Sequence, residues 1–160
     1  MKRLFLLSIV LFSFVCYSQS GGREACRNAT LDALKNTFES KTSNFYIKFD
    51  NLYMEIDLKS PHTLSDIRRV PDSDGNLYNQ AREQAYQLFK RMDDIGILKE
   101  GGTGRGFNCD FIYYYVKINY VTTDGQLLPF MMYISRRDVQ AMVYSFNRMD
   151  FQTGLKRFPI

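Results

Sequence analysis

The strongest constraint on the fold is a pair of alternating apolar runs separated by a short turn signal. The first run places apolar side chains at every second position between residues 112 and 120, and the second does so between residues 128 and 134. Thr123-Asp124-Gly125 suits a three-residue hairpin loop with glycine in the left-handed conformation. This loop would set four apolar pairs: Tyr120 with Leu128, Ile118 with Phe130, Val116 with Met132, and Tyr114 with Ile134. The sequence therefore predicts an antiparallel hairpin at about residues 110–134, with its core on that face.

The second face of the same hairpin is unusually aromatic. It carries Tyr113, Tyr115, Met131 and Tyr133, together with Lys117. An antiparallel sheet with one solvated face normally alternates apolar and polar residues, so this much aromatic area needs an explanation. Either another segment of the chain covers this face, or it binds a ligand or a partner. We take the three tyrosines and Met131 as the candidate binding residues.

The remaining patterns predict an α+β fold. Apolar residues recur at helical spacing over residues 22–40, 76–95 and 137–149. Residues 44–58 alternate with a change of parity at Asp50-Asn51, which indicates two strands joined by a tight turn or a bulge. A helix over 44–58 is the alternative, and the aromatic and β-branched content favours strands. We expect a small antiparallel sheet packed against two or three amphipathic helices.

The amino terminus has the pattern of an export signal. A basic Met1-Lys2-Arg3 precedes an apolar run over residues 4–15, which is too short to span a bilayer. Small residues at positions 16 and 18 favour cleavage before Gln19. We therefore expect a signal peptide over residues 1–18, a single exported α+β domain over 19–160, and a periplasmic or extracellular location, with no transmembrane segment after cleavage. Val15 fits a lipoprotein signal poorly, so we expect no lipid anchor at Cys16.

The cysteines and the net charge limit which classes of protein this chain can belong to. After cleavage Cys26 and Cys109 remain, and an even pair in an oxidising compartment predicts one disulfide, with two free thiols as the alternative. Loss of Lys2 and Arg3 reduces the formal net charge of +4 by two. This excess is too small to indicate binding to nucleic acid or to an anionic membrane.

Residues 72–83 are the one metal-like pattern. Asp72, Asp74 and Asn76, with Tyr78 and the closing acid Glu83, have the spacing of ligands in a calcium-binding loop. Over these twelve residues the chain resembles the EF-hand loop, which would imply a weak calcium site. The resemblance fails where that loop needs glycine for its sharp turn, because this chain has Leu77 there. Otherwise the acidic residues would cap the helix that follows.

No set of residues predicts catalysis. The single histidine, His62, would have to meet a reduced Cys109 to form a nucleophile and base pair, although distant carboxylates can also converge. We therefore expect an exported, non-enzymatic binding protein of the bacterial envelope that acts by stoichiometric association with a protein partner, for example as a cognate inhibitor (immunity protein) of a toxin. The alternatives are a small secreted hydrolase using carboxylates or Cys109, and a small-molecule carrier. We expect no cofactor apart from the calcium ion considered above.

Overall fold

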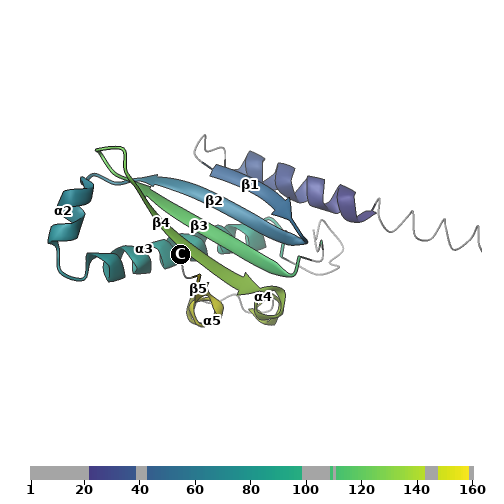
Figure 1. The fold of residues 1–160 in the computed structure, drawn as a ribbon. Helices are drawn as coiled ribbons and strands as arrows, with labels where there is room; N and C mark the ends of the chain where they lie inside the picture. The colour runs from purple at the N-terminus through teal and green to yellow at the C-terminus, as the bar shows by residue number, and fades with distance from the viewer. Residues whose placement is uncertain (1–21, 39–42, 99–108, 110, 143–147, 159–160) are drawn as a thin grey trace, which may run out of the picture.

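The computed structural model describes residues 22–38, 43–98, 109, 111–142 and 148–158 (Figure 1). A helix over residues 22–38 comes first. It is followed in chain order by β1 (Ser43–Lys48), β2 (Asn51–Lys59), α2 (Leu64–Arg69), α3 (Ser73–Asp94), β3 (Tyr113–Val121), β4 (Leu127–Ser135), α4 (Arg136–Met142), α5 (Arg148–Gly154) and β5 (Lys156–Arg157). The expected signal peptide over residues 1–18 lies outside the described residues. None of the described helices is long and apolar enough to cross a membrane.

The five strands form one mixed sheet in the order β1-β2-β3-β4-β5. The pairs β1–β2, β3–β4 and β4–β5 are antiparallel, whereas β2 and β3 are parallel. The α+β class is therefore as expected, but the expectation of an antiparallel sheet was wrong for its central pair. The physical reason is the crossover: α2 and α3 return the chain from the end of β2 to the other end of the sheet, so β3 starts beside the start of β2 (Figure 1).

The β3–β4 hairpin has the register that the alternation predicts. Tyr120 pairs with Leu128 and Val116 with Met132, so the apolar face is continuous. The N–H of Thr122 donates to the carbonyl of Gln126 at 2.9 Å, which leaves a three-residue loop. Gly125 has φ 76°, the left-handed conformation that glycine adopts without a steric penalty.

The change of parity at Asp50-Asn51 is a two-residue turn. Lys48 pairs with Asn51 across it, and both turn residues have positive φ, 47° at Phe49 and 62° at Asp50. Two consecutive positive φ values in a two-residue loop define a type I′ turn. The strand interpretation of residues 44–58 is therefore confirmed.

Helix α3 covers one face of the sheet, and its buried stripe forms the centre of the core (Figure 1). Phe89 is fully buried and meets the ring of Tyr114 edge-on, with centroids 5.7 Å apart. The helix ends in a glycine cap: Gly96 has φ 83°, and the N–H of Ile97 donates to the carbonyl of Met92 at 2.9 Å. It begins at Ser73, three residues earlier than expected.

A disulfide joins the first helix to the segment before β3. Cys26 and Cys109 are bonded, as the sequence predicted, with Cα atoms 5.6 Å apart. Leu34 of the same helix is fully buried, so the helix packs its apolar stripe into the core as well. At the other end of the chain, α4 begins with a side-chain cap, in which the N–H of Asp138 donates to Oγ of Ser135 at 3.1 Å. Helix α5 and strand β5 were not anticipated.

Candidate functional site

Four tyrosines form a continuous row across the face of the sheet opposite α3. Strand pairing places Tyr46 of β1 beside Tyr53 of β2, Tyr53 beside Tyr115 of β3, and Tyr115 beside Tyr133 of β4. Because all four are register partners, their side chains leave the sheet on the same face. Lys156 of β5 pairs with Tyr133 and ends the row. We call these four residues the tyrosine row.

The rings of the row stack on one another. The centroids of Tyr46 and Tyr53 are 5.0 Å apart with the ring planes at 2°, and those of Tyr53 and Tyr115 are 4.7 Å apart at 7°. These separations match the distance of about 4.8 Å between neighbouring strands, so the rings stand upright on the sheet. Both flat faces of Tyr53 are therefore occupied by its neighbours. What the row presents outward is ring edges and hydroxyl groups, not flat platforms.

A second set of aromatic rings surrounds the end of the row at Tyr133. Tyr113 and Phe158 each meet Tyr133 edge-on, at centroid distances of 6.0 and 6.2 Å. Phe158 is held there by its backbone N–H, which donates to the carbonyl of Met131 at 2.8 Å. Edge-on and offset contacts are the favourable geometries for aromatic pairs. The tyrosine row, Tyr113, Met131 and Phe158 together are the tyrosine face.

Burial raises the pKa of Tyr115 above its ordinary value, and the neighbouring tyrosines Tyr53, Tyr113 and Tyr133 add to the effect. The phenolic proton of Tyr115 therefore stays in place at neutral pH. Its hydroxyl can then act as a hydrogen-bond donor as well as an acceptor.

Beside the row lies a compact polar network. Lys117 donates to Oε1 of Glu55 at 2.6 Å, and Nδ2 of Asn119 donates to Glu55 at 3.1 Å and to Asp57 at 2.7 Å. The hydrogen bond from Lys117, with a second from Asn119, lowers the pKa of Glu55. At neutral pH Glu55 is thus an ion-paired carboxylate, which is poorly suited to act as a general acid.

A small hollow separates this network from the tyrosine row. It has a volume of about 30 Å³ and is lined by side chains that include Tyr53, Tyr115, Lys117 and Met131. A space of that size accommodates about one water molecule. Pockets for small organic ligands are roughly ten times larger, so this face does not favour the carrier hypothesis.

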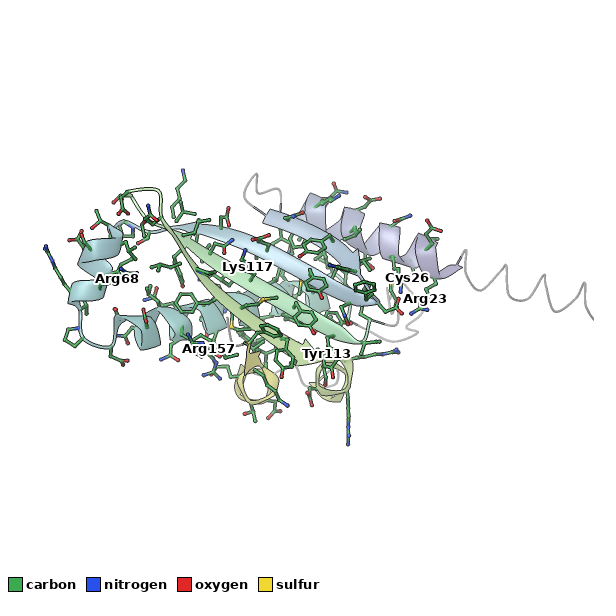
Figure 2. All side chains as sticks on the ribbon, in the orientation of Figure 1. Arg23, Cys26, Arg68, Tyr113, Lys117 and Arg157 are labelled. Atoms are coloured by element: carbon green, nitrogen blue, oxygen red, sulfur yellow. A yellow bond between two sulfur atoms is a disulfide. The ribbon has the colours of Figure 1, made fainter. Side chains whose placement is uncertain are left out.

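The tyrosine face is open where the structure describes the chain. Tyr46 is 41% exposed, Tyr113 37% and Phe158 39%, while the other three tyrosines of the row are half-buried. Helix α3 runs behind the sheet, and the labelled Tyr113 and Lys117 lie on the front face (Figure 2). The aromatic area is therefore presented to solvent.

The candidate binding residues named from the sequence come together here. Tyr113, Tyr115 and Tyr133 are mutual ring neighbours, and Met131 lines the hollow. Sequence reasoning missed Tyr46 and Tyr53. Their place in the alternation was visible, because they have the opposite parity to the apolar residues of their strands, but their neighbourhood with β3 was not.

The calcium-loop hypothesis was wrong. Asp72 is the N-cap residue of α3, and Asp74, Asn76, Tyr78 and Glu83 lie within the helix, so they do not wrap around a central point. An EF-hand loop needs an irregular backbone with a sharp glycine turn, whereas here the apolar stripe from Leu77 onward keeps the segment helical. The described residues contain no group of three or more His, Cys, Asp or Glu side chains that could hold a metal ion.

The thiol version of the hydrolase hypothesis was also wrong. Cys109 is in the disulfide and is only 3% exposed, so it offers no free thiolate. The N–H of Thr123, just beyond the far end of β3, donates to the carbonyl of His62 at 3.1 Å. Cys109, in contrast, precedes the start of that strand. A nine-residue strand is about 30 Å long, which keeps His62 and Cys109 apart.

Comparisons with known proteins assign neither a family nor a function, because no protein-family model, no curated protein and no solved structure matches this chain. The functional inference therefore rests on the geometry of the tyrosine face.

Proposed function

We propose that this protein is an exported, non-enzymatic binding protein of the bacterial envelope, and that the tyrosine face is its interface with a protein partner. The observation that carries the proposal is the tyrosine row, an in-register line of four rings across four strands of the sheet, of which Tyr46, Tyr53 and Tyr115 are stacked. Tyrosine is enriched in protein interfaces because it buries a large area at a small cost in conformational entropy. Stacking reduces that cost further, since Tyr53 and Tyr115 are already restricted in the free protein.

The charges around the row indicate the chemistry of the partner. Lys156 ends the row on β5, and Lys48, also exposed, lies at the edge of the same face on β1. The acids of the face, Glu55 and Asp57, are already engaged by Lys117 and Asn119. The outward charge is therefore positive, and it fits an acidic patch rich in hydrogen-bond acceptors. An inhibitor that blocks an acidic surface of a toxin is one example of a protein that would use such a positively charged tyrosine face.

Export rests on two features. The first is the signal-like sequence of residues 1–18, and the second is the disulfide, a bond that persists mainly in oxidising compartments. The disulfide also leaves no free thiol among Cys26 and Cys109. An envelope location follows from the signal and fits the disulfide.

Site-specific photocrosslinking in the native cells tests the proposal. A benzophenone amino acid replaces Tyr46 at the exposed end of the row, and a matched probe replaces Lys90 on the exposed side of α3. The proposal predicts a single adduct containing one partner molecule from position 46 and none from position 90. Adducts from neither position, or equal adducts from both, would count against an interface on the tyrosine face.

A further inference from the structure

The β1–β2 turn holds an aromatic residue in a conformation that aromatic residues rarely adopt. Phe49 has φ 47°, and its side chain is 82% exposed. Type I′ turns are normally built from asparagine and glycine, because a Cβ atom is disfavoured at positive φ. A bulky residue in this region is a genuine outlier, and such strain is concentrated at functional sites. Folding alone does not account for a phenylalanine at this position.

Phe49 belongs to an exposed apolar tip at one end of the sheet. Ile112 is 53% exposed and Tyr113 is 37% exposed. The N–H of Ile112 donates to the carbonyl of Asp50 at 2.9 Å, and the N–H of Tyr113 donates to Oδ1 of Asn51 at 3.1 Å. These bonds fix the start of β3 against the turn, so the backbone places Ile112 and Tyr113 next to the turn that carries Phe49. We call Phe49, Ile112 and Tyr113 the apolar tip.

Positive charges surround the tip. The Lys48 ammonium lies 5.4 Å from the centroid of the Phe49 ring. The carboxylate of Asp50 is shared by Arg23 and Arg27 of the first helix, so one acid faces two guanidinium groups. These ion pairs also brace the turn against the helix. In this group of described residues three cations, Arg23, Arg27 and Lys48, accompany one anion, Asp50, although the net charge of the whole chain gave no such indication.

The amino-terminal segment joins the fold at the same end. The described part of the first helix starts at residue 22, and Nη2 of Arg23 lies 3.1 Å from Oδ2 of Asp50 in the tip turn. The apolar run over residues 4–15 precedes this point by only a few residues.

From these features we propose that the apolar tip inserts into the surface of an anionic lipid bilayer, with Phe49 as the inserted residue. Phe49 is 82% exposed on a two-residue turn, so its partner must be able to surround a projecting ring. A bilayer interface does so, and it accepts aromatic rings and attracts neighbouring lysines and arginines. This membrane contact shares Tyr113 with the protein interface proposed above but is otherwise a different surface, centred on Phe49, and it would hold the tyrosine face beside the membrane.

The absence of tryptophan from the chain makes the test direct. In Phe49→Trp the new indole is the only one, so its fluorescence reports the tip alone. Val70→Trp is the matched control, because Val70 is 54% exposed and follows α2 at the opposite end of the molecule (Figure 1). The protein is purified from its own cells with the amino terminus it carries there. It is then mixed with vesicles of phosphatidylglycerol and phosphatidylethanolamine, with or without brominated acyl chains.

Insertion predicts that the emission of Phe49→Trp moves to shorter wavelength and is quenched by the brominated lipid, whereas that of Val70→Trp does neither. The response should be weaker on phosphatidylcholine vesicles and at high salt, because the charges are then unmatched or screened. In otherwise unmodified protein, Phe49→Asn should weaken vesicle binding by about tenfold, the effect of losing one buried aromatic side chain.

Two outcomes would overturn the inference: no vesicle binding at all, or binding that leaves the indole at position 49 unquenched. The first would be the result if the tip enters a protein pocket instead, and the second if another surface binds the vesicle. Tyr53→Ala should leave the response of the tip unchanged. Failure of the tip and failure of the tyrosine face can therefore be told apart.

Discussion

Removal of the Cys26–Cys109 disulfide should cost this protein a large share of its stability. The bond closes a loop with a sequence separation of 83, which contains β1, β2, α2 and α3. In the chain-entropy treatment, releasing a loop of this length raises the entropy of the unfolded chain by about 15 cal/mol/K. That corresponds to a loss of about 4.5 kcal/mol in the free energy of unfolding at 25 °C, against a typical total of about 5–15 kcal/mol.

The variant is Cys26→Ala with Cys109→Ala, studied by urea unfolding with far-ultraviolet circular dichroism. For a domain of about 140 residues the loss corresponds to a fall of about 15 °C in Tm. The m-value should stay equal or rise, because the unfolded chain exposes at least as much surface without the cross-link. Cys16→Ala, which changes the cysteine outside the loop, is the control and should have no effect.

The m-value also separates two kinds of destabilisation. Leu34 is fully buried, and Phe38 packs on Phe45 with ring centroids 5.9 Å apart, so the first helix has contacts that do not depend on the bond. If the helix detached without the disulfide, less surface would remain to be exposed and the m-value would fall. A loss of less than about 1 kcal/mol would refute the reasoning, because the loop would then not constrain the unfolded state.

Three further predictions follow from single contacts. Phe49→Asn should raise the free energy of unfolding by about 1 kcal/mol in chemical denaturation, because asparagine tolerates positive φ; a decrease would show that the turn is not strained. Burial raises the pKa values of Tyr115 and Tyr120 above 10.0, so their contribution to stability is complete below pH 10.0 and lost as pH rises through the folded-state pKa values. Absorbance titration should show phenol groups that ionise late and together with unfolding, and free-tyrosine behaviour throughout would contradict this. The hydrogen bond from Lys117 lowers the pKa of Glu55 from 4.5. The free energy of unfolding lost in Lys117→Met should therefore shrink as pH falls below 4.5. A loss that stays constant with pH would exclude this ion pair as its cause.

The parts of the fold that were predictable are local in sequence. The β3–β4 register follows from alternation on both sides of Gly125, because a slip of one residue would turn every apolar side chain to solvent. The end of α3 was likewise visible at Gly96, where the backbone needs positive φ. In both places one short segment contains the whole signal.

Pairings between distant segments were not predictable in the same way. Alternation shows which face each side chain of β2 occupies, but not that β2 lies beside β3 or runs parallel to it. Half of the tyrosine row depends on that pairing, since it brings Tyr53, and through it Tyr46, to Tyr115. Strand β5 has two residues, Lys156 and Arg157, which is too short for any periodicity.

The calcium motif failed for a different reason. Its residues match by type and spacing, but liganding depends on the backbone, and the segment from Ser73 is helical. The apolar stripe that includes Leu77, Ala81 and Ala85 gave the competing signal, and burial of that stripe determined the structure.

The most direct test of the account is a calorimetric titration of the purified protein with the partner that is crosslinked from position 46. The account predicts one-to-one binding that Tyr53→Ala and Tyr115→Ala each weaken by about 2 kcal/mol or more, roughly thirtyfold in Kd. Lys90→Ala, on the opposite side of the molecule, should bind as tightly as the unaltered chain. Equal affinities for all four proteins would show that the stacked tyrosines are not the surface by which this molecule recognises its partner.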